Sequence, residues 1–464
     1  MLVVARETQL MNATNATWYE STRSDRELRP HLNYELDADV CVIGGGLAGL
    51  SIARKIARRG WSVVLLEAKR LAGAASGRNT GFVIPGYSET TDAMIERIGL
   101  DHTKQLWALS EQGLADVRHM IEETGMAGVD PVPGWLHVSK TDDGERNRVR
   151  VERLRWIGAE VEFWPTERVR AELANPRYYS AVHFPTAFHI NPLNYALGLA
   201  RAAEQAGVRI FENTPAVELD PTGVRKRIST PEGHLRAGHI VLAGGLDIRA
   251  LMPRLAATLL PVSTYVLVTE PLGPAVHELI RYRGAVSDTN RADNHYRIVD
   301  GANPSGARLQ WSGRMRTWAA NPRFAARGLV NDIRRNYPAL EKIEIAHLWR
   351  GTLGRPLHRM PQLGELDPGL WVASGFGGHG LNTTAMAGEL IARAIIDRDE
   401  TWRLFAPYEL VWAGGFAGRA LAQAIYWGSR PVDRAAAWLA QKREQEQKRK
   451  AARRAAAAAA KAAE

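Results

Sequence analysis

The chain has 464 residues, of which 45% are apolar and 24% are charged, and its single cysteine is Cys41. This length is enough for a large buried core and two closely joined domains, whereas one cysteine excludes internal disulfides, cysteine-based zinc sites and iron–sulfur clusters held by this chain alone. The formal net charge is +10, and residues 441–464 hold eight Lys and Arg against three Asp and Glu, so half of the excess lies in the C-terminal tail.

Residues 1–36 are polar and have no periodic pattern, which predicts an N-terminal arm. The first residues show no basic segment followed by a long apolar run. No apolar run in the chain reaches the roughly 18 residues that a membrane-spanning helix needs. We therefore expect a cytoplasmic protein.

A glycine-rich turn follows the first apolar run of the chain. Residues 38–43 are nearly all apolar, as in a strand that is covered on both faces. They lead into the glycine segment 44–49, then into apolar residues at helical spacing up to Gly60, and then into a second apolar run over residues 63–66. This pattern predicts a βαβ unit.

The spacing of glycines in this unit is that of a dinucleotide site. Gly44 permits a tight turn, Gly46 lets the backbone approach a pyrophosphate, and Gly49 lets the helix pack closely on the strand. Leu47 and Ala48 open the helix, whose N-terminus would face the phosphates. Glu67 ends the second strand, where a carboxylate accepts hydrogen bonds from a ribose 2′-hydroxyl and repels a 2′-phosphate, so NADP is disfavoured.

Two further glycine segments follow buried-strand patterns. Residues 73–81 form a loop of small residues directly after the second strand, where a bulky flat ring could be admitted. Residues 239–243 and 370–374 are apolar runs that end at glycine, and Gly375-Phe376-Gly377-Gly378-His379-Gly380 precedes a helical pattern. Two glycine-rich helix starts indicate one for a pyrophosphate and one for a flavin ring.

The stretches between these segments have a different character. Residues 134–138, 263–269, 295–299 and 308–311 alternate Val, Tyr and Trp with polar residues, as half-buried antiparallel strands do. We therefore predict an α/β fold with an α+β second domain: a Rossmann-like FAD-binding domain interleaved with a mostly antiparallel substrate domain. The expected segments are an arm (1–36), the FAD-binding domain (37–130, 186–262 and 346–400), the substrate domain (131–185 and 263–345), a C-terminal helical region (401–440) and a basic Ala/Lys/Arg-rich tail (441–464).

The chain resembles the FAD-dependent D-amino-acid oxidase superfamily, within it the branch of gamma-glutamylputrescine oxidase, glycine oxidase and sarcosine oxidase. The resemblance covers residues 37–396 and continues into the C-terminal region. The motifs that carry it are Asp39 to Gly46, Ala75-Ser76-Gly77-Arg78-Asn79, His189-Ile190-Asn191-Pro192, Asp288-Thr289, Tyr296, Arg308 to Arg314, Gly377-Gly378-His379-Gly380, Gly414-Gly415, Arg419, Tyr426-Trp427 and Asp433-Arg434.

This resemblance implies oxidation of an amine or amino acid. A hydride equivalent passes from the carbon next to nitrogen to flavin N5, water hydrolyses the imine, and oxygen takes the electrons to give hydrogen peroxide. No metal site is expected. The residues expected to contact FAD are Gly44, Gly46, Leu47, Ala48, Gly49, Glu67, Ala68, Ser76, Gly77, Arg78, Asn79, Gly244, Gly375, Gly377, Gly378, His379, Gly380 and Leu381.

Three residues are the main catalytic candidates. His379 is expected as a proton donor or as a neighbour that packs beside the ring. By resemblance to sarcosine oxidase, Tyr296 falls where an active-site tyrosine lies, with core packing as the alternative. Arg314 falls where that enzyme has an active-site histidine; its planar guanidinium suits a carboxylate, with a surface ion pair as the alternative. The weaker candidates are Arg350, Arg355, Trp311 and Trp349, the tryptophans either as walls around a cationic amine or as core.

Departures from the sarcosine oxidase pattern refine the expectation. Trp349 aligns with the cysteine that attaches the flavin there, so FAD is expected to be noncovalent. Gln310 replaces a lysine that assists reaction with oxygen, and Asn382 replaces a carboxylate-binding lysine. The change at Gln310 weakens the expectation of fast oxygen use. The change at Asn382 disfavours a sarcosine-like substrate and favours an amine with a distant polar or anionic group, such as gamma-glutamylputrescine.

Other functions stay open at this stage. A dehydrogenase that passes electrons to a quinone or carrier shares the first half-reaction. A tRNA-modifying flavoenzyme is suggested by the basic tail, but the sequence holds no fused RNA-binding module, and we expect no nucleic-acid partner. Peripheral membrane contact is a further alternative to a helix docked on the flavin domain with a solvated tail. It rests on the basic run and on Trp412, Phe416, Leu421, Ile425, Tyr426 and Trp427.

Overall fold

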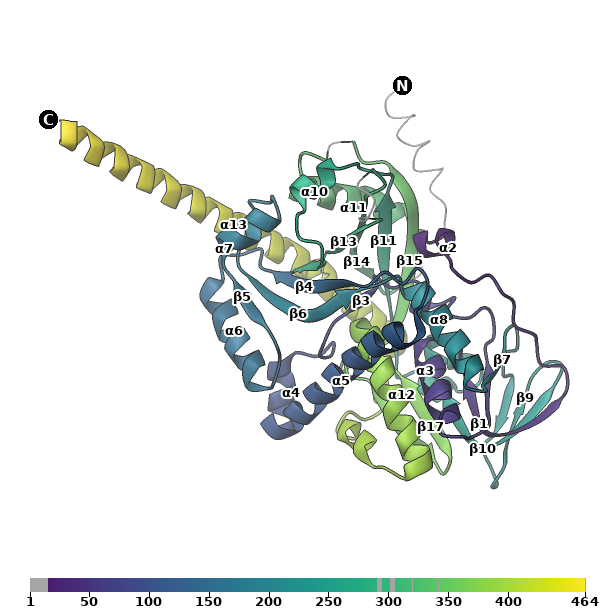
Figure 1. Cartoon of the computed structure of the whole chain (residues 1–464). Coiled ribbons are helices and arrows are strands. Elements are labelled where there is room, and N and C mark those ends of the chain that lie inside the picture. Colours follow the sequence, from purple (N-terminus) through teal and green to yellow (C-terminus); the bar gives the residue numbers. More distant parts are fainter. Residues whose placement is uncertain (1–15, 290–293, 301–304, 319, 341, 464) are drawn as a thin grey trace.

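The computed structural model describes residues 16–463 except 290–293, 301–304, 319 and 341. Two β-sheets lie end to end, and helices cover their faces (Figure 1). The first fifteen residues of the expected N-terminal arm lie outside the described part. Among the described helices, none is both long and apolar enough to cross a membrane.

The first sheet has the strand order β16-β17-β10-β1-β2-β7, and its strands from β17 to β7 are parallel. The bounds are β1 Glu35–Ile43, β2 Val63–Leu66, β7 Arg209–Phe211, β10 His234–Leu242, β16 Gln362–Asp367 and β17 Leu370–Ser374, with β8 Glu218–Asp220 and β9 Lys226–Ser229 attached to β10. This is the doubly covered parallel sheet that the apolar runs predict.

Both faces of the first sheet are buried over the apolar runs of its central strands, such as Val40–Ile43 in β1 and Val63–Leu66 in β2. Val40 and Val42 pack among the helices α3 (Leu47–Ala57), α5 (Leu100–Thr124), α8 (Pro192–Gln205) and α12 (Gly380–Asp397). Cys41 and Ile43 point to the other face, where Leu32 of the N-terminal arm packs with them. Burial on both faces explains the continuous apolar runs.

The second sheet has the order β15-β11-β14-β13-β12-β4-β6-β3, with β5 beside β6. All of these pairings are antiparallel except the one between β12 and β4. The bounds are β3 Phe82–Val83, β4 Val132–Val138, β5 Glu162–Trp164, β6 Ala181–His189, β11 Leu260–Thr269, β12 Ala285–Asp288, β13 His295–Val299, β14 Arg308–Arg316 and β15 Ile345–Arg355.

The second sheet extends beyond the segments assigned to it from the sequence: the ends of β6 and β11 fall within residues 186–262, and two further strands lie almost wholly outside. β3 falls within residues 37–130 and β15 opens residues 346–400, both of which were expected to belong to the FAD-binding domain. β15 pairs with β11 from Leu260↔Arg355 to Thr269↔Ile345. This long pairing brings the second sheet to the edge of the first.

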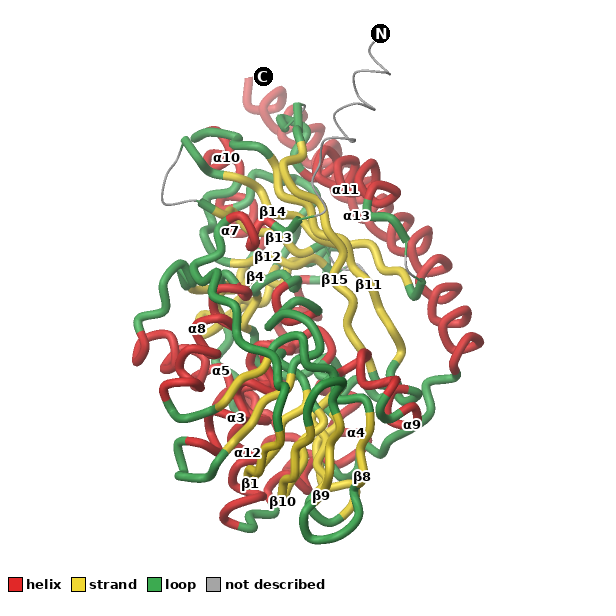
Figure 2. Tube along the Cα trace, turned by 90° about the vertical axis from the view of Figure 1, so that its right-hand side faces the viewer, coloured by secondary structure: helices red, strands yellow, loops and turns green. Residues whose placement is uncertain are grey.

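Helices cover the second sheet and its flanks. The helix α11 (Arg323–Asn336) packs on β14 and β11. The long helix α13 (Gly415–Ala463) runs along the outside of the molecule, and its C-terminal part projects away from the body (Figures 1 and 2). The remaining helices are α2 Trp18–Ser21, α4 Thr91–Ile98, α6 Gly144–Trp156, α7 Thr166–Glu172, α9 Pro253–Ala256 and α10 Ala275–Leu279, with the short 3-10 helices η1 Ala75–Gly77, η2 Gly245–Ala250, η3 Gly377–His379 and η4 Thr401–Phe405.

Candidate active site

The first glycine segment makes the turn from β1 into α3. Gly44 has φ +117°, and a Cβ there would collide with the backbone of Ala243 at the end of β10. Gly46 caps α3 without a side-chain hydrogen bond, and a Cβ added to it would meet only Ser76. The Leu47 N–H donates to Ser76 Oγ at 3.0 Å. A glycine turn at the start of a helix is the arrangement through which backbone N–H groups can approach a pyrophosphate.

Glu67 lies beside this turn at the end of β2. Its carboxylate accepts the N–H of Gly45 at 2.7 Å and the N–H of Lys69 at 2.9 Å. Burial raises the pKa of Glu67, although these two hydrogen bonds act in the opposite direction. An acceptor held at this place fits the ribose hydroxyls of an adenosine dinucleotide.

The second glycine segment, residues 75–81, connects the first turn to the second sheet. Ser76 binds the start of α3, as described above. The Trp349 indole N–H donates to the carbonyl of Arg78 at 3.0 Å, and the Gln310 amide donates to the carbonyl of Thr80 at 3.0 Å. A loop of small residues thus lies between the first glycine turn and the strands β14 and β15.

The third glycine segment leads from β17 into α12. Gly375 and Gly377 have φ +68° and +60°, conformations that favour glycine. A Cβ on Gly375 would clash with Pro356, directly after β15, and the Gly378 N–H donates to Ser88 Oγ at 2.8 Å. β15 also contacts η1 and η3. The three glycine segments therefore meet at the junction of the two sheets.

His379 lies in the third segment with a neutral ring. Burial lowers the pKa of His379 to about 4, and its Nδ1 has no hydrogen-bond partner among the described residues. His295 of β13 lies nearby, and burial lowers the pKa of His295 to about 4 as well. At neutral pH both rings are therefore neutral imidazoles, each with one N–H, and neither is the imidazolium acid.

One face of the second sheet carries a buried polar cluster, formed by Tyr19, His189, Arg297 and Gln310. The Arg297 guanidinium donates to the carbonyl of Ile190 at 2.7 Å, lies 2.9 Å from His189 Nδ1, and reaches the Tyr19 hydroxyl at 3.2 Å and Gln310 Oε1 at 3.3 Å. The Tyr19 hydroxyl in turn donates to Gln310 Oε1 at 2.9 Å. We call this side of the sheet the front face, because Gln310 binds the second glycine segment.

Arg297 is a buried cation without a matching anion. Arg297 is only 3% exposed. Its Nε has no hydrogen-bond partner, and no carboxylate of the described residues forms an ion pair with its guanidinium. Burial lowers the pKa of Arg297. A buried charge of this kind is costly unless a bound group of opposite charge compensates it.

Tyr296 lies on the opposite face, which we call the back face because α11 covers it. Its ring stacks on Trp311 with centroids 4.4 Å apart, and its hydroxyl lies 2.8 Å from that of Tyr337. Tyr296 and Trp311 are fully buried in a core that includes Leu329 of α11. The structure therefore does not bring Tyr296 or Trp311 to the glycine segments, in line with the core-packing alternative.

Arg314 is turned to the back face by an irregularity in β14. The β11–β14 register shifts between Ser263 and Tyr265, and Arg314 adopts φ +59° there. Its guanidinium pairs with Asp332 of α11 at 2.8 Å and donates to the carbonyl of Gly328 at 2.8 Å. The bulge, which adds a residue to one strand, reverses the alternation of side chains beyond it. Arg314 thus makes the ion pair that was the alternative to a substrate contact.

Arg355 lies next to the third glycine segment. It is half-buried beside Pro356, and burial together with Arg359 lowers the pKa of Arg355 to about 10. Within the described chain no hydrogen bond or ion pair is found for it, although Glu89 contributes a weaker attraction. Arg350, in contrast, donates to the carbonyl of Ala320 at 3.5 Å. Of the arginines considered from the sequence, Arg355 is the one placed to receive an anionic group.

Tyr19 and Arg297 are site candidates that the sequence analysis did not identify. Tyr19 belongs to the N-terminal segment that was predicted to be a polar arm, although the aromatic pair Trp18-Tyr19 departs from the polar composition of that segment. Arg297 stands in the middle of a strand that was expected to pack in the core, where a charged residue is itself a signal. In the described residues no group of His, Cys, Asp and Glu side chains is arranged to hold a metal ion.

Comparison with known proteins defines the class. The family described as DAO, FAD dependent oxidoreductase, matches residues 39–394. The chain belongs to this family, and it is a flavin enzyme of the amine and amino-acid oxidoreductase type, as the sequence resemblance implied.

Two relatives show how far the similarity extends. Gamma-glutamylputrescine oxidoreductase of Escherichia coli is 30% identical over 402 residues, which cover 85% of this chain and 92% of the relative. Glycine oxidase of Geobacillus kaustophilus is 26% identical over 385 residues, which cover 80% of this chain and 96% of the relative.

Solved structures share the fold, which confirms the predicted mixed α/β architecture. The crystal structure of the Geobacillus kaustophilus glycine oxidase has a TM-score of 0.68 at 22% identity, covering 81% of this chain and 98% of the other. L-Proline dehydrogenase from P. horikoshii has a TM-score of 0.66 at 17% identity, covering 82% and 98%.

Proposed function

We propose that the chain binds FAD noncovalently where the three glycine segments meet. The observation that carries this proposal is the glycine turn at the N-terminus of α3, where Glu67 binds the N–H of Gly45 and Ser76 binds the N–H of Leu47. The one thiol of the chain, Cys41, is buried inside β1, and burial raises its pKa, so it offers no reactive thiolate for attachment. Trp349 stands where the resemblance places a flavin-linking cysteine.

The reaction we propose is oxidation of a C–H bond next to an amine nitrogen. A bound flavin would supply the hydride acceptor at N5, and water would hydrolyse the imine product. In this proposal the N–H groups at the start of α12 would stabilise negative charge on the bound ring. His379 contributes a neutral ring beside it rather than an acid, because its pKa is near 4.

The substrate we propose is an amine that carries an anionic group away from the reacting carbon. Arg355 supports this, since it is a half-buried guanidinium beside the third glycine segment for which no hydrogen bond or ion pair is found in the described part of the chain. Asn382 has no charge and is fully buried, with its amide directed to the carbonyls of Gly86 and Ser110, which disfavours a carboxylate next to the reacting carbon. The similarity to gamma-glutamylputrescine oxidoreductase favours the same substrate class.

Oxygen is the electron acceptor we favour, with hydrogen peroxide as the product. Gln310 lacks the charge of the lysine found in sarcosine oxidase, but the Arg297 guanidinium lies 3.3 Å from Gln310 Oε1. The positive charge is therefore kept at this place by a neighbouring strand. A dehydrogenase that uses a quinone or carrier is the second candidate.

The test has two stages. Anaerobic flavin bleaching is measured with gamma-glutamylputrescine, polyamines, N-methyl amino acids, glycine and D-amino acids. Bleaching by the longer amines supports the proposal, and bleaching by D-alanine or sarcosine alone contradicts it. Stopped-flow mixing of the reduced enzyme with air then separates the two acceptors, because an oxidase must be reoxidised at a rate that matches turnover.

A further inference from the structure

The helix α13 is held to the body by a polar and small-residue side. Gln423 is fully buried and accepts the Thr317 N–H at 3.0 Å, and Tyr426 and Ser429 are also buried. Further along, Glu444 makes a bidentate ion pair with Arg170 of α7 at 2.7 and 2.9 Å. These contacts fix which side of α13 faces solvent.

Between Phe416 and Leu439, α13 exposes seven large apolar side chains. We define the apolar face of α13 as Phe416, Leu421, Ile425, Trp427, Val432, Trp438 and Leu439, whose exposed fractions range from 44% to 76%. The face spans about 35 Å at 1.5 Å per residue, and Trp412 continues it at 66% exposure. Monomeric soluble proteins seldom expose contiguous apolar surface of this extent without using it to bind something.

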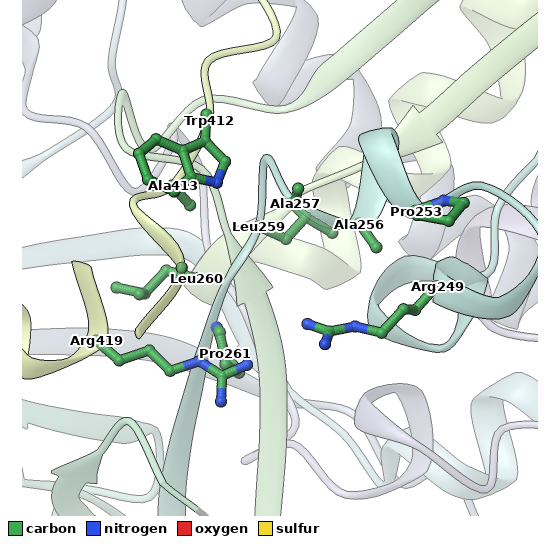
Figure 3. A pocket seen from close by; sticks show the side chains of 11 residues that line it. Arg249, Pro253, Ala256, Ala257, Leu259, Leu260, Pro261, Trp412, Ala413 and Arg419 are labelled. Carbon is green, nitrogen blue, oxygen red and sulfur yellow. The ribbon is translucent and has the colours of Figure 1, made fainter. Parts of the chain in front are cut away.

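A pocket opens at the start of this face. It has a volume of about 280 Å³ and lies between η2, α9 and the beginning of β11 on one side and residues 412–419 on the other. Its lining is mainly apolar, and the guanidinium groups of Arg249 and Arg419 are both directed towards Pro261 (Figure 3). Apolar walls with two cations suit an anionic headgroup whose acyl part stays in an apolar environment.

The net charge of α13 indicates which kind of partner binds its apolar face. α13 contains eleven Lys and Arg against three Asp and Glu, which accounts for eight of the ten net positive charges of the chain. A second copy on this face would bring two strongly basic helices together, whereas an anionic lipid surface compensates them. Three exposed tryptophans, Trp412, Trp427 and Trp438, are the residue type that prefers the membrane–water interface.

We propose that α13 docks the protein on an anionic lipid surface through the apolar face of α13 and the basic residues that follow it. The helix lies in the interface plane, with its apolar side chains among the headgroups and its basic tail along them. This inference does not depend on the substrate proposed above.

The test uses the full-length holoenzyme and sedimentation with lipid vesicles. We expect binding to vesicles that contain phosphatidylglycerol, little binding to phosphatidylcholine alone, and weakening by salt. The triple variant F416S/W427S/W438S should lose at least tenfold in affinity. A second variant, K448Q/R449Q/K450Q, should lose affinity for phosphatidylglycerol vesicles while its apolar face is intact.

The matched control is W156S/F324S, which removes two equally exposed aromatic residues, at 62% and 76%, elsewhere on the molecule. It should bind like the wild type, and all variants should retain flavin absorbance. Absence of wild-type binding to phosphatidylglycerol vesicles overturns the proposal, as does equal loss in the control. A dimer in analytical ultracentrifugation that dissociates in F416S/W427S/W438S also overturns it, because the face would then be an interface between copies.

Discussion

Each face of the second sheet carries an arginine, and the two arginines differ in whether a carboxylate lies next to them. On the front face Arg297 lies with Tyr19 and Gln310 and has no carboxylate partner among the described residues. On the back face Arg314 forms an ion pair with Asp332 close to the stacked Tyr296 and Trp311. An arginine that a carboxylate already neutralises serves the fold, whereas a buried arginine with no such anion among the described residues is available to act on a bound group.

The contrast between Arg297 and Arg314 has functional meaning only if FAD binds beside the front face. Gly46→Val should abolish FAD retention, because a branched side chain fills the space at the start of α3 beside Ser76. The purified variant should be colourless, whereas the wild type should be yellow and release FAD on acid precipitation. Flavin that stays on the wild-type polypeptide after acid would show that the attachment is covalent.

The sharpest contrast is between the two arginines. Arg297→Met should slow reoxidation of the reduced flavin by oxygen roughly tenfold to a hundredfold, since it removes the positive charge near Gln310. Arg297→Lys should restore part of the rate. Arg314→Met should leave reoxidation unchanged and lower only the melting temperature. Stopped-flow absorbance measures the rates, and equal effects of the two Met variants would remove the distinction between the faces.

A second pair of arginines tests the substrate side. Arg355→Ala should lower kcat/KM for an anionic amine about tenfold or more, the cost of losing a hydrogen bond to a charged group. Arg350→Ala is the matched control, because Arg350 hydrogen-bonds the carbonyl of Ala320 instead. Substrate-dependent flavin reduction provides the measurement. Unchanged concentration dependence in Arg355→Ala would exclude Arg355 from substrate binding.

The smallest expected effect is the pH dependence that His379 adds to stability. Burial lowers its pKa from 6.5 to about 4, so the unfolded state binds a proton first as the pH falls. Stability is lost between pH 6.5 and 4, by about 1–2 kcal/mol at pH 5 after allowance for partial exposure. In His379→Gln the free energy of unfolding should change less between pH 7 and pH 5, as followed by circular dichroism, whereas Tyr296→Phe should retain the wild-type pH dependence.

The part of the candidate site that would bind the dinucleotide could be predicted from the sequence, because the conformations it needs depend on residues close together in the chain. Gly44 needs a positive φ, Gly46 needs space and Glu67 needs the end of a strand, and each condition involves residues close in the chain. The apolar runs likewise showed that both faces of the first sheet are buried. Residue type and spacing are enough to determine such features.

The substrate end and the surface of α13 were decided by tertiary structure. Arg314 faces α11 because a bulge changes the alternation in β14, and Tyr19 enters the front face because the arm crosses to the second sheet. The sequence predicted a helical C-terminal region and a basic tail, but only contacts such as those of Gln423 and Glu444 determine which side chains of α13 stay exposed. Which side of an element is buried depends on register and docking partners that lie far away in the chain, and local residue patterns do not encode these.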